Sequence, residues 1–410
     1  MGFKIVNNKK ADILAFLLLL SVFVVSYFEY FFRDISLRFW IVVFVLLIPF
    51  FPRLCKVLKA KYLISICAYI VGTFCVCLLQ TLTNSSIGIT YAMGQVFLLF
   101  IFLLLAIITK ESLCEKMVAL ITIIAAYSVI IYALCSFFPQ IKYYLIDVLT
   151  PHFTSLGAEN AIQEGAGKNF IVYNFQQLSE YTLIFRNCGP FWEPGMFAVF
   201  LNIALFVNLF LLKGKSIVTI ILVIALLTTV STGGYIGGLF ILICSSILNK
   251  KNILFSIASI VLFVVFLIFF FNTDFMGDKL VSQLTDTTLG DDTSRFGALL
   301  THLKIFADHP IWGYYGLEGY VVDDRKALAS GLLIPLSSRG FIVGLLYYYL
   351  LYKASLRYSA FYARSKRVGV SLFLLILLLS MSQTMLLSSC LMVYIFAGLL
   401  LKQKTEYVTV

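Results

Sequence analysis

The sequence predicts an all-α polytopic integral membrane protein with about 12 transmembrane helices. Three observations support this fold class. The 410 residues are 61% hydrophobic and 12% charged, whereas a soluble domain is about 45–50% apolar and about 25% charged. The apolar residues form runs close to the ~20 residues that cross a bilayer as a helix. Basic residues gather between alternate runs, as they do in cytoplasmic loops.

The apolar runs define the expected helices in chain order. The runs near full length are 13–31, 62–80, 92–109, 117–138, 191–212, 253–272 and 331–352, and a shorter run covers 39–52. Two longer runs, 216–248 and 368–401, must each be divided. We expect the first division at Ser231–Gly234 and the second around Ser382–Thr384. Each half is then about 14–18 residues long, the lower end of the range for a span.

The charges between these runs predict that both termini are cytoplasmic. With this orientation, Lys and Arg cluster in every inner loop, whereas the outer connections 81–90, 231–234 and 382–389 contain none. Omitting one of the two divisions would invert every later loop. The net charge of +11 therefore marks membrane orientation, and binding to nucleic acid is not expected.

The predicted organisation alternates helices with two long extracytoplasmic loops. Five helices occupy 1–138, the first loop 139–190, four helices 191–271, the second loop 272–330, and three helices 331–410. Long loops of this kind are usually functional. A transporter places ionisable residues within its spans, whereas the predicted spans are nearly free of them. We therefore expect the chemistry at the outer face, on a substrate whose lipid tail lies in the bilayer.

The end of the first loop, residues 186–197, holds the strongest candidates. Its aromatic residues, including Trp192, suit an interfacial anchor, and Pro194 suits the first turn of a helix. Arg186 and Glu193 are harder to explain as anchors because both charges lie at the membrane surface. An arginine beside a helix N-terminus is a natural anion site.

The second loop contains a predicted helix from Arg295 to Asp308, capped by Ser294 and ended by Pro310. Arg295 and His309 would lie ~21 Å apart along a straight helix, so only one of them can join Arg186 at a single phosphate. We interpret His302, between them, as a structural surface histidine. The pairs Asp291–Asp292 and Asp323–Asp324 are interpreted as solvated loop acids, and no metal site is expected.

Residues 186–197 resemble the signature of Wzy-type polymerases of O-antigen and capsular polysaccharide, whose superfamily includes the O-antigen ligases. Residues 231–235, Ser-Thr-Gly-Gly-Tyr, resemble the small-residue hairpin of this family. Ser294-Arg295, followed by the run from His309 to Gly316, is similar to its second-loop element. The resemblance covers residues 186–340.

This resemblance implies a metal-independent glycosyltransferase with no cofactor in the bacterial inner membrane, with its active site on the periplasmic face. It implies an undecaprenyl-pyrophosphate-linked donor and a lipid-linked repeat unit as acceptor, with a chain-length regulator and a flippase as pathway partners. Arg186 and Arg295 would bind the pyrophosphate and Trp192 the glycan, while Glu193 or His309 would act as base. An O-antigen ligase, which moves finished glycan to lipid A-core or protein, and a lipid-linked oligosaccharide flippase remain alternatives.

Overall fold

The computed structural model describes most of the helical chain. The described residues are 9–28, 37–53, 62–83, 88–149, 168–170, 173–177, 185–248, 295–314, 321–322, 325–326 and 330–401, with isolated positions between 261 and 268. Apart from those isolated positions, the predicted span 253–272 therefore lies outside the described residues, as do both aspartate pairs and Ser294.

The described chain is mostly helical. Its first half contains α1 (Lys9–Tyr27), α3 (Leu37–Leu47), α5 (Leu63–Thr83), α6 (Ile89–Thr109), α7 (Leu113–Phe137) and α8 (Pro139–Tyr143). Its second half contains α10 (Pro194–Phe206), α11 (Ser216–Thr228), α12 (Thr232–Leu248), α15 (Arg295–Asp308), α16 (Ile334–Tyr362), α17 (Lys366–Ser380) and α18 (Ser389–Leu400). Short irregular helices extend α3, α8 and α10.

The helices confirm the expected divisions of the two long apolar runs. One run separates into α11 and α12 around residues 229–231, and the other into α17 and α18 around residues 381–388. Five described helices, α5, α6, α7, α16 and α10 with its extension, are long and apolar enough to cross a membrane. The number of spans and their orientation stay predictions.

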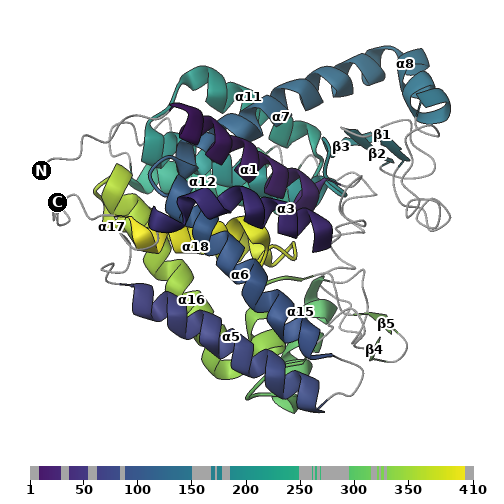
Figure 1. Cartoon of the computed structure of the whole chain (residues 1–410). Coiled ribbons are helices and arrows are strands. Elements are labelled where there is room, and N and C mark those ends of the chain that lie inside the picture. The colour runs from purple at the N-terminus through teal and green to yellow at the C-terminus, as the bar shows by residue number, and fades with distance from the viewer. Residues whose placement is uncertain are drawn as a thin grey trace, which may run out of the picture.

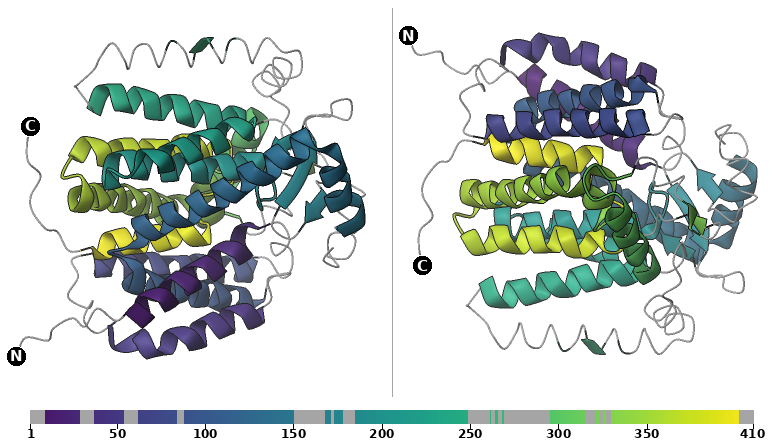
Figure 2. Two further views of the ribbon diagram at one scale, coloured as in Figure 1. Left: turned by 90° about the horizontal axis from the view of Figure 1, so that it is seen from above. Right: turned by 90° about the horizontal axis from the view of Figure 1, so that it is seen from below.

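The helices form one bundle whose two ends carry different elements (Figures 1 and 2). The start of α1 and the end of α18 lie at one end, whereas the strands and α15 lie at the other. The first predicted loop is more ordered than expected, because it contains an antiparallel sheet of β1 (Lys168–Phe170), β2 (Tyr173–Gln177) and β3 (Phe185–Asn187). A second hairpin joins β4 (Val321–Val322) and β5 (Arg325–Lys326).

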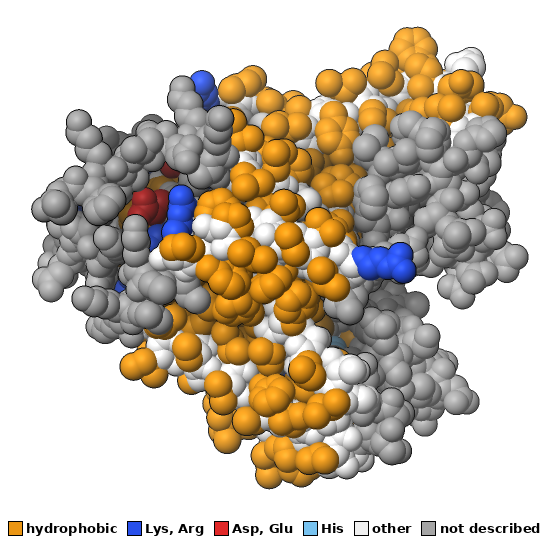
Figure 3. All heavy atoms as spheres, in the orientation of Figure 1, with side chains coloured by type: hydrophobic (Ala, Val, Ile, Leu, Met, Phe, Trp, Pro, Cys, Tyr) orange, Lys and Arg blue, Asp and Glu red, His pale blue; other side chains and the backbone are white. Residues whose placement is uncertain are grey.

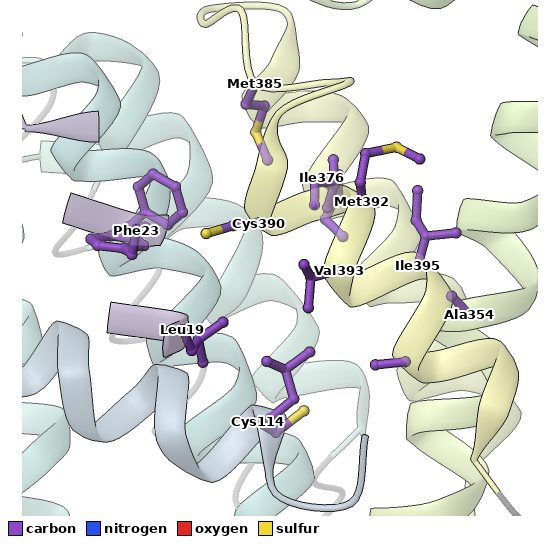
Figure 4. Close-up of a cluster of buried hydrophobic side chains, with 14 of the residues drawn as sticks. Leu19, Phe23, Cys114, Ala354, Ile376, Met385, Cys390, Met392, Val393 and Ile395 are labelled. Atoms are coloured by element: carbon purple, nitrogen blue, oxygen red, sulfur yellow. The ribbon is translucent and has the colours of Figure 1, made fainter. Parts of the chain in front are cut away.

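Apolar side chains fill the bundle and also cover its outside. Figure 4 shows one part of the core, where Leu19 and Phe23 of α1 lie near Cys390 and Val393 of α18. On the outside, Figure 3 shows a broad hydrophobic face over α3, α5 and α6. Ile64 there is 82% exposed. Such a surface is stable against lipid tails rather than water.

Candidate active site

A cavity of ≈ 270 Å³ lies where the starts of α10, α12 and α15 meet the α17–α18 connection. It brings together three of the candidate residues, Arg186, Glu193 and Arg295, although they are far apart in sequence. The other polar lining residues are Ser231, Thr232, Ser330, Ser382 and Gln383, and the apolar ones include Ile236, Phe296, Leu299, Leu378 and Met381.

Arg186 is positioned by the sheet and by the end of α11. Arg186 lies in β3 and pairs with Gln176 of β2. The guanidinium donates from Nε to the Thr229 carbonyl at 3.3 Å and from Nη2 to the Val230 carbonyl at 2.9 Å. Arginine has five N–H donors, so these two contacts orient the group and leave other donors for a ligand.

The carbonyl of Val230 is presented by an unusual backbone conformation. Val230 has φ +49°, a left-handed region that a β-branched residue rarely adopts. Residues held in such conformations cluster at functional sites, where the surrounding structure must stabilise them. The turn between α11 and α12 thus both orients Arg186 and supplies Ser231 and Thr232 to the cavity wall.

The charges in the cavity influence one another. Burial lowers the pKa of Arg186, and the nearby Arg295 guanidinium lowers it further, while Glu193 opposes the change. Two guanidinium groups therefore share the cavity with one carboxylate. Because like charges repel more strongly at a partly buried site, a bound anion would relieve the repulsion between Arg186 and Arg295.

Three helix N-termini line the same cavity and add to its positive potential. α10 begins at Pro194, α12 at Thr232 and α15 at Arg295. The first N–H groups of a helix lack partners within the helix, and the helix dipole places partial positive charge there. Together with two guanidinium groups, these termini are suited to a phosphate or pyrophosphate.

Glu193 lies immediately before α10, with an extended backbone that ends the preceding turn. Its side chain makes no capping hydrogen bond and lines the cavity. The next helical residue, Gly195, lies against Gln383 of the α17–α18 connection, and a β-carbon there would overlap the Gln383 amide. This close approach explains why a glycine follows Pro194 and brings the α17–α18 connection to the cavity.

Trp192 lies outside the lining of the cavity. Its ring is stacked on Tyr27 of α1, with centroids 6.1 Å apart. The Asn174 side-chain amide donates to the carbonyls of Phe191 and Trp192 at 3.1 and 2.9 Å, which anchors this segment to β2. These contacts pack Trp192 against the core of the bundle, and its predicted roles as an interfacial anchor and in glycan binding stay predictions.

His309 is separated from the cavity by the length of α15. The helix runs without a break from Arg295 to Asp308, as predicted, so His309 follows its far end, ~21 Å from Arg295 along the axis. Its ring lies 5.2 Å from that of Tyr314. Of the two candidate bases, only Glu193 lines the cavity with the arginines.

His302 corrects one prediction, because it is buried rather than on the surface. Its Nδ1 lies 3.0 Å from Ser337 Oγ of α16, and burial lowers its pKa to about 4. The sequence predicted the helix that carries His302, but it did not show that α16 packs against this residue. The expected structural role fits these contacts.

The sequence interpretation missed three polar residues of the cavity and one buried arginine elsewhere in the bundle. Ser330, Ser382 and Gln383 line it, but their only sequence signal was a polar interruption between apolar runs. It also missed Arg339, a buried arginine of α16. A charged residue within the apolar run 331–352 was a visible signal of function.

Residues 217–324 match the family model described as O-antigen ligase. This match supports a relation to the O-antigen ligase/polymerase superfamily. The matched segment includes α11, α12 and α15 and therefore the cavity residues Ser231, Thr232 and Arg295. Arg186 and Glu193 precede the matched segment. No curated protein and no solved structure matches the chain.

Proposed function

We propose that this protein is a polymerase that joins undecaprenyl-pyrophosphate-linked oligosaccharide repeat units on the outer face of the bacterial inner membrane. The observation that carries the proposal is the cavity in which Arg186, Arg295 and Glu193 meet three helix N-termini. It combines a site for a pyrophosphate leaving group with a carboxylate suited to accept a proton. The membrane-embedded bundle around it fits a lipid-linked substrate.

The donor in this proposal is the growing chain on undecaprenyl pyrophosphate. Negative charge develops on the pyrophosphate oxygen as the bond to the sugar C1 breaks. Arg186 and Arg295 stabilise that charge through bidentate hydrogen bonds, and the helix N-termini of α10, α12 and α15 add backbone donors. The apolar lining residues Ile236, Phe296 and Leu378 accommodate the first part of the polyprenyl tail.

The acceptor is the terminal sugar hydroxyl of a second lipid-linked repeat unit. Its oxygen forms the new bond to C1 of the donor sugar, its proton passes to the Glu193 carboxylate, and undecaprenyl pyrophosphate leaves with the electron pair of the broken bond. A base must lie within hydrogen-bond reach of the proton it removes, and Glu193 shares the cavity with the arginines. His309 then acts on the distal glycan, outside the cavity.

The ligase is the second candidate, because the family model that matches residues 217–324 is described as O-antigen ligase. A ligase would use the same leaving group and the same arginines, and would differ in its acceptor. The run from Trp192 to Gly195, which resembles the polymerase signature, favours the polymerase.

Deleting the gene and separating the surface polysaccharide on a gel tests the proposal. We expect the polysaccharide ladder to collapse to a single-repeat band, and we expect the wild-type gene, but not Arg186→Ala, to restore it. Lys304→Ala is a matched control, because Lys304 is an exposed cation on α15 outside the cavity. Long lipid-linked chains that fail to reach their final acceptor would instead identify a ligase.

A further inference from the structure

Arg339 is a charged residue inside the helix bundle. It lies in α16 just before Gly340, whose φ of +73° interrupts the helix. Only 8% of Arg339 is exposed. An ionisable residue within an apolar span is costly, and such residues commonly mark a functional site.

The surroundings of Arg339 satisfy its hydrogen bonds only in part and do not neutralise its charge. Nη1 donates to Cys77 Sγ at 2.9 Å and to Tyr91 Oη at 3.3 Å, and Nη2 donates to Gln95 Oε1 at 2.8 Å. Within the part of the chain that the structure describes, none of these three partners is a carboxylate, and Nε is buried with no hydrogen-bond partner. A buried charge without a counter-ion is strongly unfavourable.

A cavity of ≈ 180 Å³ adjoins this guanidinium. Since water occupies roughly 30 Å³ per molecule in the liquid, the space can hold a phosphate group. Its polar lining includes Arg339, Gln95 and Thr73. The remaining wall is largely apolar, with Leu98, Leu99, Phe102 and Met392 from α6 and α18. A ligand with both an anionic and an apolar part would match these two surfaces.

This cavity is distinct from the candidate active site. The first half of the α17–α18 connection, Met381 to Gln383, lines the active-site cavity, whereas Leu387 and Ser389 at its other end line the Arg339 cavity. The two cavities share no lining residue. Among the residues that the structure describes, these two cationic cavities are therefore separate and lie toward opposite ends of the α17–α18 connection.

We propose that the Arg339 cavity binds the phosphate of a membrane lipid. The unneutralised guanidinium requires an anion, and the apolar wall within the bundle favours one attached to a lipid chain. The phosphate can come from a polyprenyl-linked substrate or from an anionic phospholipid of the bilayer. The inference does not rest on the proposed polymerase function, because it depends only on the surroundings of Arg339.

Lipid binding by the purified full-length protein tests this inference. The Arg186→Ala/Arg295→Ala double variant serves as the background, because it removes the two guanidinium groups of the other cavity. Undecaprenyl phosphate, phosphatidylglycerol and zwitterionic phosphatidylcholine are titrated separately, and bound lipid is measured by native mass spectrometry. We expect an anionic lipid to bind, and Arg339→Gln to weaken its binding about tenfold or more, the usual effect of losing hydrogen bonds to a charged group.

Arg357→Gln is the matched control. Arg357 is also on α16 and donates from Nε to the Gly398 carbonyl at 3.2 Å, near the end of α18, so this variant should keep the background affinity. A preference for undecaprenyl phosphate would assign the cavity to a lipid-linked substrate. A preference for phosphatidylglycerol would assign it to a bilayer phospholipid. Either preference supports the inference if the Arg339→Gln substitution abolishes that preference.

The inference is overturned if folded Arg339→Gln binds anionic lipid as tightly as the background does. It is also overturned if no lipid binds, or if phosphatidylcholine binds equally well. If Arg339→Gln does not fold, Arg339→Lys provides the test. Lysine retains the charge but not the planar fork of donors, so we expect weaker lipid binding, and an unchanged affinity would overturn the inference.

Discussion

Replacing Arg186 tests the assignment of the pyrophosphate site. Arg186→Ala removes one of the two guanidinium groups in the cavity and frees the carbonyls of Thr229 and Val230, to which it donates. Loss of one preorganised donor to a developing anion typically lowers kcat by about 10²–10³-fold, or about 3–4 kcal/mol. We expect an effect of this size on the rate of glycan transfer.

The location of Arg186 allows its chemical role to be separated from its structural role. Arg186→Lys keeps the charge but cannot make both backbone hydrogen bonds and also bind phosphate through a planar fork. It should therefore retain more activity than Arg186→Ala but remain well below wild type. The assay is release of undecaprenyl pyrophosphate by the purified protein supplied with lipid-linked repeat units, with Lys304→Ala as control. If Arg186→Ala released it at the wild-type rate, Arg186 would have no part in leaving-group stabilisation.

Three further predictions concern other residues. Glu193→Gln should lower the rate of glycan transfer about 10²–10⁴-fold, the usual contribution of a general base, with little change in donor binding. Equal transfer rates for Glu193→Gln and the wild-type protein would exclude Glu193 as the base. Gly195→Ala should impair transfer and lower the Tm, because the added β-carbon would overlap the Gln383 side chain. The control Gly94→Ala should leave stability unchanged or raise it by up to about 1 kcal/mol, because nothing lies within 4 Å of the added β-carbon. Equal Tm values for the two variants would contradict the proposed packing of Gly195 against Gln383. The pKa of His302 is about 4 in the folded protein and about 6.5 in the unfolded chain. Neutral His302 therefore contributes its full stabilisation of the fold above pH 6.5, and the free energy of unfolding should decrease by roughly 3 kcal/mol in total as the pH falls toward 4. The same decrease in a His302→Gln variant would contradict this assignment.

The sequence allowed the helices and part of the site to be predicted because the relevant signals are local. The bounds of α15 follow from its apolar spacing and from Pro310, and the divisions near Ser231 and Ser382 follow from interruptions in apolar runs. Arg186, Glu193 and Arg295 were identified as charges at helix ends near the membrane surface. Their meeting in one cavity required the structure.

The features that were missed or wrongly predicted depend on contacts between distant segments. His302 was expected on the surface because the local sequence predicts α15 but not that α16 packs against His302. The three-stranded sheet, by contrast, joins strands that are consecutive in the chain, and it was not predicted because these strands are only three to five residues long, too short to show a clear alternation. The contribution of Gln383 depends on its contact with Gly195, almost two hundred positions away in the sequence.

Reconstitution of the purified protein with a single lipid-linked repeat unit tests the central claim most directly. The measurement is the length of the glycan product together with the amount of undecaprenyl pyrophosphate released. We predict a ladder of lengthening chains, with one undecaprenyl pyrophosphate released for each new linkage, and release about 10²–10³-fold slower with Arg186→Ala. If undecaprenyl pyrophosphate were released only when lipid A-core is added as acceptor, and no ladder formed, the result would contradict the polymerase proposal and identify a ligase.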